Sequence, residues 1–327
     1  MLSRIDSKVI TVLVIVAALF LIPIFLKSPY YLRIIINMFI FTVLAYGIRL
    51  VALTGQLTMG HAAFMGIGAY VSALLTTNLG WNFWYCLPLS GITAAIVAML
   101  VGYTTLRIKG AYFAISTFAF GEALRLMYVN WSGFFGGASG IANIPMPNPI
   151  VSLHFDNLQS LYILGLCLTV LALLIMYRLE KSWFGLTFVS IGQADILAQC
   201  VGINIMRYKL MAFVIACFFA GITGSFFAHV QSFISADDFT FTTSCYLLIY
   251  VVVGGTYSFA GPLCGVIVLI LIPVLLRYIP NYNPVAEPII LGVFLLVTML
   301  FLPRGLTSLP DRASEAVKRF QKGKEVQ

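Results

Sequence analysis

Charge is scarce in this sequence, because only 9% of its 327 residues are Asp, Glu, Lys or Arg, while 61% are hydrophobic. A soluble domain of this length carries much more charge, so the composition excludes one. Alternating ten-residue strands are also missing, which argues against an outer-membrane barrel. In hydrocarbon every backbone N–H and C=O must be paired within its own segment, which favours helices. The composition therefore predicts an all-α, polytopic transmembrane helical bundle.

Motifs of catalysis and of nucleotide binding are missing as well. The pattern G-x-x-x-x-G-K-[ST] does not occur, so the chain lacks the usual cradle for ATP phosphates, and H-E-x-x-H is absent too. The histidines His61, His154 and His229 are far apart in sequence, and the six cysteines are scattered without a C-x-x-C pair. We expect no catalytic residues, no metal site and no cofactor on this chain.

Long apolar runs fill most of the sequence. At 1.5 Å per residue, a helix of about 20 residues crosses roughly 30 Å of hydrocarbon. The third and eighth runs are glycine-rich or short, and if either is a broken or re-entrant helix, eight or nine spans remain. The first is expected to be retained, because no A-x-A-like cleavage site follows it. The ten predicted spans are 9–26, 34–53, 60–77, 85–106, 110–130, 161–177, 209–230, 243–257, 262–278 and 286–302.

The net charge of +8 is best explained by orientation in the membrane. With a cytoplasmic start, the predicted inside segments hold 14 of the 19 lysines and arginines when Lys209 at a boundary is included, and the outside loops hold only Lys27 and Arg33. Basic residues gather on the cytoplasmic side of membrane proteins. We therefore expect both termini inside, a proline-rich outside loop over 131–160 and a cytoplasmic tail over 307–327. The whole chain, 1–327, is expected to form a single transmembrane domain.

One helix-length segment, 178–208, breaks the apolar pattern. It lies on the predicted inside, and a polar segment there is available to a cytoplasmic partner. Its polar residues include Arg178, Glu180, Lys181, Gln193, Asp195, Gln199, Asn204 and Arg207.

A second distinctive stretch runs from Thr54 to Tyr70. Gln56, Thr58 and His61 place polar groups at a membrane edge, which predicts a lining or gating role, with Tyr70 at the end of the same run. An ordinary turn with helix packing is the alternative. Small residues let helix backbones approach closely. The glycines expected to act in this way, here and later in the chain, are Gly60, Gly66, Gly68, Gly254, Gly255, Gly261 and Gly265.

The stretch from Thr54 to Tyr70 closely resembles the signature of inner-membrane permease subunits of branched-chain amino acid ABC importers, the leucine–isoleucine–valine type. The resemblance extends over roughly residues 45–306. Its other motifs are Thr117–Arg125, Asn130-Trp131, Gly136-Gly137-x-x-Gly140, Val253-Gly254-Gly255, Gly261-Pro262-x-x-Gly265 and Pro303-Arg304-Gly305-Leu306.

The resemblance implies a multi-pass subunit of the bacterial inner membrane without catalysis of its own. A second permease subunit would complete the translocation path, as a heterodimer. Two ATP-binding cassette subunits would bind ATP and Mg and drive transport, and a periplasmic binding protein would deliver substrate. Branched-chain or other apolar amino acids are the expected substrates, while urea, short amides and aromatic acids remain open because relatives of this type carry them.

The resemblance also implies that 178–208 couples the chain to an ATPase. The matching residues are Phe184, Gly185, Asp195, Ala198 and Gly202. The chain departs from the family where arginines are expected, since it has Leu186, Val189 and Gly192 there. A helix that docks in a groove can bind by its apolar face, so docking is retained in principle.

Glu122 and Arg125 are ionisable residues inside a predicted span, three positions apart on one helix face. Charge at membrane depth is costly and indicates function, here a place in the translocation path. A self-neutralising structural pair is the alternative. If they are coupling groups, the chain is instead an ATP-independent secondary transporter. A remote third hypothesis, an intramembrane serine protease, rests on Gly137-Ala138-Ser139-Gly140 with Ser139 as nucleophile.

Overall fold

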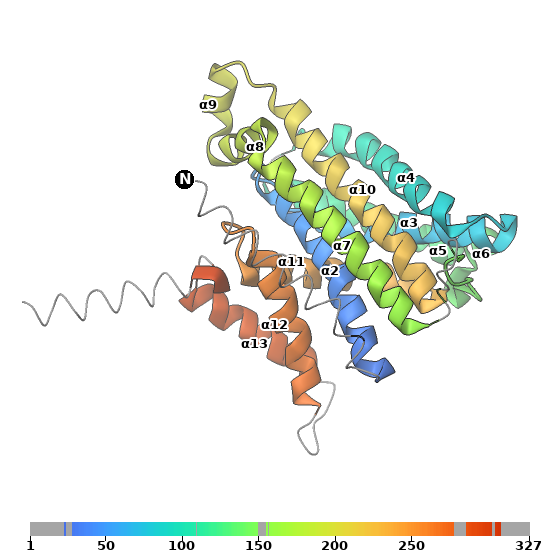
Figure 1. The fold of residues 1–327 in the computed structure, drawn as a ribbon. Helices are drawn as coiled ribbons and strands as arrows, with labels where there is room; N and C mark the ends of the chain where they lie inside the picture. The colour runs from blue at the N-terminus through green and yellow to red at the C-terminus, as the bar shows by residue number, and fades with distance from the viewer. Residues whose placement is uncertain are drawn as a thin grey trace, which may run out of the picture.

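The computed structural model describes residues 23, 28–108, 110–149, 155, 157–277, 286–302 and 305–308. These residues are almost all helical, and the long helices pack into one bundle (Figure 1). The predicted span 9–26 falls outside the described residues apart from Pro23, and so do the predicted tail beyond Ser308 and part of the loop 131–160. The predicted all-α fold is confirmed.

Among the described residues, nine helices lie at the positions of the second to tenth predicted spans. They are α2 (Pro29–Ala52), α3 (His61–Leu79), α4 (Phe83–Thr105), α5 (Ala111–Asn130), α7 (Leu158–Lys181), α10 (Ile205–Gln231), α11 (Phe241–Gly254), α12 (Gly261–Leu276) and α13 (Glu287–Phe301).

Shorter elements connect these helices. They are α6 (Ser132–Phe135), α8 (Trp183–Gln193), α9 (Asp195–Cys200), the 3-10 helices η1 (Gly137–Ser139), η2 (Ala236–Phe239) and η4 (Leu306–Ser308), and the strands β1 (Ile141–Ala142) and β2 (Phe233–Ile234).

Within the described residues, five helices are long and apolar enough to cross a membrane: α2, α3, α4, α7 and α10. Shorter apolar helices lie over Phe241–Gly254, Gly261–Leu276 and Pro288–Thr298. The helix α5 is 20 residues long but is not among the five. Its Glu122 and Arg125 lower its apolar character. The third predicted span is a continuous helix, and the eighth is a helix of only 14 residues.

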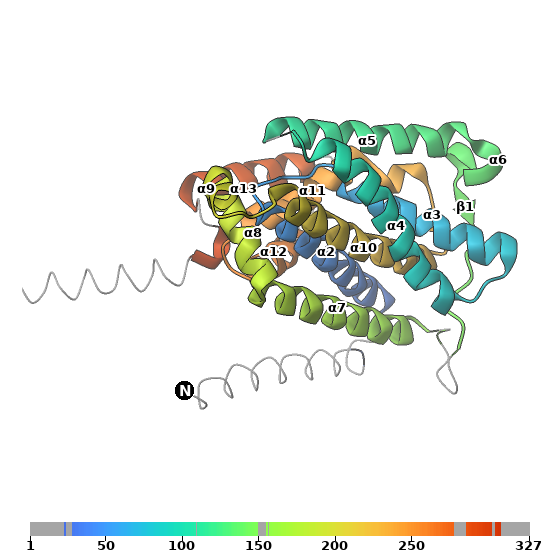
Figure 2. The same cartoon turned by 90° about the horizontal axis from the view of Figure 1, so that it is seen from above.

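The centre of the bundle is α10, which packs against α2, α3 and α4. Figure 2 shows α5 and α7 on opposite sides of the bundle, with α2 and α10 between them. Small residues make the central contacts possible. A Cβ on Gly68 would overlap the carbonyl oxygen of Gly221, and one on Gly224 would overlap that of Met65. These helices therefore touch through their backbones.

The two ends of the bundle differ. At one end β1 and β2 form a short antiparallel pair, with Ile141 opposite Ile234. A buried chain of hydrogen bonds fixes this end. The Ser225 hydroxyl donates to Ser72 Oγ at 2.8 Å, and Ser72 meets His229 Nε2 at 2.9 Å. His229 Nδ1 lies 2.6 Å from the Pro145 carbonyl oxygen and must donate to it, because a carbonyl only accepts.

At the other end, α8 and α9 lie beyond the ends of α7 and α10 (Figure 1). The turn after α2 lies at this same end because it contacts α8. The loop 255–260 between α11 and α12 lies there too, because Phe259 contacts Tyr177 near the end of α7. We call this end the coupling end, and the end with β1 and β2 the hairpin end.

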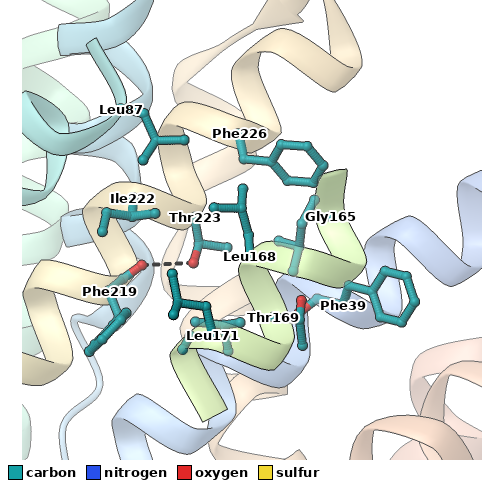
Figure 3. A pocket seen from close by; sticks show the side chains of 13 residues that line it. Phe39, Leu87, Gly165, Leu168, Thr169, Leu171, Phe219, Ile222, Thr223 and Phe226 are labelled. Atoms are coloured by element: carbon teal, nitrogen blue, oxygen red, sulfur yellow. Dashed lines mark hydrogen bonds between the residues drawn. The ribbon is translucent and has the colours of Figure 1, made fainter. Parts of the chain in front are cut away.

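A cavity of about 90 Å³ lies between α2, α7 and α10, with Leu87 of α4 at its wall (Figure 3). Its lining is apolar apart from two threonines. Thr223 donates its hydroxyl to the Phe219 carbonyl at 2.7 Å, and Thr169 donates to the Phe39 carbonyl at 3.5 Å. Both hydroxyl protons are used internally, so the two threonines offer no hydrogen-bond donor to a carboxylate group in the cavity.

Candidate functional site

The stretch from Thr54 to Tyr70 begins as a buried turn at the coupling end. Its backbone reverses at Gly55, where φ is +76°, a value that favours glycine. Gln56 and Thr58 are buried, and Thr58 Oγ1 accepts a hydrogen bond from the Gly60 amide at 3.4 Å. The Met59 amide donates to Thr117 Oγ1 at 3.1 Å, which ties the turn to α5.

His61 is the first residue of α3 and is completely buried. Its Nε2 lies 2.7 Å from where a Cβ on Gly47 would stand, so the imidazole fills space left by that glycine of α2. Neither ring nitrogen has a hydrogen-bond partner. A neutral imidazole has one N–H donor and one acceptor nitrogen, and in this conformation neither is used.

Tyr70 lies nearer the hairpin end and is also buried. Its ring stacks on Tyr128 of α5, with centroids 4.2 Å apart, and contacts Phe135 at 5.4 Å and Phe239 at 5.9 Å. Its hydroxyl has no partner. These four rings close the α3–α5 interface at the hairpin end.

Glu122 and Arg125 lie on α5 and are half-buried. Arg125 Nε donates to Glu122 Oε2 at 2.8 Å, and Arg125 Nη1 lies 3.9 Å from Asp237 Oδ1 of η2. The arginine therefore has two carboxylates around it. Asp237 is the partner that the sequence did not indicate, because it is 112 positions away from Arg125.

The predicted gate residues thus form two groups. Gln56, Thr58 and His61 lie at the coupling end of α3, while Tyr70 lies with the α5 residues toward the hairpin end. All four are buried among packed helices. Of the five buried polar atoms without a hydrogen-bond partner in the described part of the chain, four belong to Gln56, His61 and Tyr70, and the fifth is Ser90 Oγ.

The predicted coupling segment folds as two short helices, α8 and α9, separated at Ala194. Gly185 is buried in the first turn of α8, where a Cβ would overlap the Glu180 carbonyl oxygen. Asp195 starts α9 and accepts a hydrogen bond from Lys209 Nζ at 3.2 Å. Ala198 is buried, and Gly202 ends the segment at φ +85°.

Large apolar side chains cover the outer surface of this segment. Trp183 is 86% exposed and Ile196 is 72% exposed. Large apolar side chains that are exposed together mark a surface for interaction. We call these residues the α8–α9 surface, and they are Trp183, Phe184, Leu186, Ile196, Leu197 and Val201.

The segment is packed directly on the turn after α2. A Cβ on Gly192 would overlap the Leu53 carbonyl oxygen, so the end of α8 touches the residues just before Gly55. The two stretches that the sequence singled out separately are therefore in contact. Glycine stands at position 192, where an arginine was expected, and no larger residue fits there without movement.

Arg49 and Glu180 form an ion pair that the sequence analysis missed. Arg49 Nη1 and Nη2 reach Glu180 Oε2 and Oε1 at 2.5 and 2.9 Å. Arg49 lies inside an apolar run of α2, and an ionisable residue at such a position requires a partner. That requirement was the signal available in the sequence.

Ser139, the nucleophile of the protease hypothesis, lies in η1 at the hairpin end. The serine–histidine hydrogen bond that the structure does contain joins Ser72 to His229. It is completely buried, and the second nitrogen of His229 bonds a carbonyl where a protease places a carboxylate. The geometry gives the protease hypothesis no support.

Comparison with known proteins agrees with the resemblance. Residues 30–302 match the family model described as branched-chain amino acid transport system / permease component. The chain is 33% identical over 291 residues to the high-affinity branched-chain amino acid transport system permease protein LivM of Escherichia coli K12, covering 82% of this chain and 67% of that protein. LivM of Salmonella typhimurium LT2 gives the same values.

More distant similarities were also found. The nucleoside ABC transporter permease protein NupC of Lactococcus lactis is 23% identical over 192 residues, covering 54% of this chain and 60% of NupC. The solved structure of PsaBC from Streptococcus pneumoniae in complex with Fab has a TM-score of 0.47 at 12% identity, covering 88% of this chain and 97% of that one. The family match and the LivM similarity carry the conclusion: this chain belongs to the family of branched-chain amino acid transport permease components.

Proposed function

We propose that this chain forms, with a second permease subunit, the translocation path of an ABC importer for branched-chain or related apolar amino acids. Two separate ATPase subunits drive it, and a periplasmic binding protein delivers the substrate. The chain spans the bacterial inner membrane with its coupling end in the cytoplasm. The observation that carries the proposal is the α8–α9 surface, an apolar surface on two short helices at one end of the bundle.

The ATPase subunits dock on the α8–α9 surface in this proposal. Six large apolar side chains project from it. The helices that carry them, α8 and α9, have 11 and 6 residues and are too short to span a membrane. An apolar helix face of this kind fits a groove in a partner. Leu186, Val189 and Gly192 stand where the family has arginines. In this proposal, binding to the ATPase therefore depends more on apolar burial than on charge.

The second permease covers α5 in this proposal. Glu122 and Arg125 are only half-buried, and α5 exposes them beside small residues such as Ala119 and Ala123. Lipid is a poor environment for charged groups, so a protein surface or a water-filled path is the better neighbour. In this proposal the ion pair therefore lies beside the path between the two permeases.

The gate in this proposal is formed by Gln56, Thr58, His61 and Tyr70, with Glu122 and Arg125. Their support is the set of unpartnered atoms on Gln56, His61 and Tyr70. Each unpartnered buried polar group costs about 1–3 kcal/mol, so it persists where another state satisfies it. In our proposal the open or substrate-bound state supplies those hydrogen bonds.

The proposal is tested by purifying the tagged chain from its native membrane in mild detergent and identifying the proteins that accompany it. Two ATPase subunits and a second permease are expected. Uptake of radiolabelled leucine into proteoliposomes of that complex should then require ATP and the binding protein. Recovery of the chain alone, active without ATP, would contradict the proposal and favour the secondary transporter.

The double variant Trp183→Ala/Ile196→Ala should separate the chain from its ATPase subunits. Each side chain loses about 1.5–3 kcal/mol of apolar burial, so together they weaken Kd by roughly 100-fold or more. The measurement is the amount of ATPase recovered with the purified chain. Gln199→Ala, an exposed polar position on α9, is the matched control and should recover the wild-type amount. Equal recovery for all three chains would show that the ATPase docks elsewhere.

A further inference from the structure

Six side chains and backbone groups meet at the coupling end in a cluster that the proposed function does not use. They come from α2, from the last turn of α7 and from the loop between α11 and α12. We call this cluster the Arg49 junction, and its members are Tyr46, Arg49, Tyr177, Glu180, Thr256 and Phe259.

Arg49 is the centre of the junction. Its side chain is 3% exposed, and that of Glu180 is 20% exposed, so the pair is largely withdrawn from water. Beyond the two bonds to Glu180, Arg49 Nε donates to the Thr256 carbonyl oxygen at 3.1 Å. The planar guanidinium of Arg49 therefore bonds to α7 through Nη1 and Nη2 and to the loop 255–260 through Nε. Because its N–H groups have fixed directions, it restricts the orientation of both partners as well as their distance.

The Phe259 ring contacts three side chains of the junction. Its ring centroid lies 4.7 Å from that of Tyr46 and 5.0 Å from that of Tyr177, and the Arg49 guanidinium carbon lies 5.6 Å from it. The Tyr46 hydroxyl also donates to the Phe259 carbonyl oxygen at 2.6 Å. The loop 255–260 thus cannot move away from α2 without breaking several contacts together.

The junction is connected directly to the coupling segment. Glu180 lies three residues before Trp183, where α8 begins, and a Cβ on Gly185 would overlap the Glu180 carbonyl oxygen. The first turn of α8 therefore rests on the backbone of Glu180. A force that displaces α8 must displace Glu180 as well, because no flexible spacer separates them.

The junction is also connected to the far side of the bundle. The loop 255–260 joins α11 to α12, and these two helices touch through their backbones, because a Cβ on Gly265 would overlap the Tyr250 carbonyl oxygen. Thr307 donates to the Gly254 carbonyl oxygen at 3.2 Å. The loop, the two helices and the described end of the chain therefore form one packed unit.

We propose that the Arg49 junction transmits displacement of α8 to the α11–α12 unit, with Arg49 and Glu180 as positioning residues for transport. This inference rests on the proposed function, since ATPase subunits must move α8. A buried ion pair adds little net stability because of its desolvation cost, but separating the two charges leaves each of them buried without a partner, which is costly. Arg49 and Glu180 are therefore expected to move together. Contiguous networks of packed side chains, hydrogen bonds and ion pairs carry coupling between distant sites.

The test uses the complete transporter in proteoliposomes and measures amino acid imported per ATP hydrolysed. The variant Glu180→Gln keeps the size of the side chain and removes its charge. Its import per ATP should fall about tenfold, within the range of roughly 5- to 150-fold that is typical of coupling between sites. A purely structural defect lowers the amount of complex and scales import and hydrolysis together, so the ratio does not change.

Two further variants complete the design. Tyr46→Phe removes only the hydroxyl bonded to Phe259 and should lower the ratio by about threefold, since one hydrogen bond contributes about 0.5–1.5 kcal/mol. Arg107→Gln is the matched control, because Arg107 is an exposed basic residue that contacts the Tyr103 ring at 4.7 Å and lies outside the junction. Its ratio should equal that of the wild type.

The outcomes separate the two proposals. A wild-type complex without ATP-driven import contradicts the proposed function itself. A wild type that imports, together with an unchanged ratio in Glu180→Gln, overturns the junction proposal alone. If Glu180→Gln does not assemble, Tyr46→Phe decides the question, because an unchanged ratio there overturns the proposal and a lowered ratio supports it.

Discussion

Replacement of Gly68 by leucine is expected to prevent close packing of α3 on α10 and to lower the Tm of the purified chain by roughly 10 °C. A Cβ at this position would overlap the carbonyl oxygen, the Cα and the carbonyl carbon of Gly221. All three are backbone atoms, so no rotamer change relieves the overlap, and the two helices must separate. Overpacking costs about 3 kcal/mol or more in such a case, and each kcal/mol shifts Tm by roughly 2–4 °C in domains of about 150–250 residues.

The effect is large because the same contact holds a third helix. A Cβ on Gly221 would itself overlap the Ser90 carbonyl oxygen of α4, so α3, α10 and α4 meet at one level of the bundle. Moving α10 away from α3 therefore presses it against α4. The measurement is thermal unfolding in detergent, followed by tryptophan fluorescence.

The matched control for Gly68→Leu is Gly292→Ala. Gly292 lies inside α13, and nothing stands within 4 Å of a Cβ built there. This change should leave Tm unchanged or raise it slightly, because alanine favours a helix over glycine by about 0.5–1 kcal/mol. A Gly68→Leu chain that unfolds at the wild-type temperature would show that α3 and α10 do not touch through their backbones.

Helix positions could be predicted from the sequence because apolar run length is a local property. The run 110–130 became α5 (Ala111–Asn130), and 262–278 became α12 (Gly261–Leu276). Local signals also mark the ends of other helices. Asn82 caps α4 by accepting a hydrogen bond from the Trp84 amide at 3.2 Å, and Gly80 ends α3 in the left-handed region.

The faces of these helices could not be predicted in the same way. Most apolar helices here have little amphipathic pattern, because lipid and protein interior are both apolar. No pattern in the sequence places His61 against Gly47, since neither residue determines the rotation of α2 and α3. The ion pair between Arg49 and Glu180 joins positions 131 residues apart, and only tertiary packing brings them together.

The coupling segment shows both cases. The segment 178–208 was singled out by its polar residues and by the family resemblance, and the structure has two short helices within it. Its contact with the turn after α2 did not follow, because that contact depends on the absence of a side chain at Gly192. A missing side chain leaves no periodic pattern in the sequence. The strands β1 and β2 could not be predicted either, because they have two residues each and pair loops about 90 positions apart.

The variant His61→Leu should leave Tm unchanged or raise it, and should lower amino acid uptake at least about tenfold. Leucine has a similar volume and removes two ring nitrogens that are buried without partners. Removing an unpartnered buried polar group relieves a cost of about 1–3 kcal/mol, so stability should not suffer. Uptake falls because the group is proposed to bond substrate or a moving helix in another state, and about 1.4 kcal/mol lost there is tenfold in rate or affinity.

Ser90→Ala is the matched control for this variant. Ser90 Oγ is also buried without a hydrogen-bond partner, but it lies on α4, away from the predicted gate. Its removal should relieve a similar cost in Tm and leave uptake at the wild-type rate. The two variants together separate a functional polar group from an accidental one, because each removes a buried polar group without a hydrogen-bond partner. Equal uptake in His61→Leu and the wild type would remove His61 from the gate, and loss of uptake in both variants would attribute the effect to packing around α10.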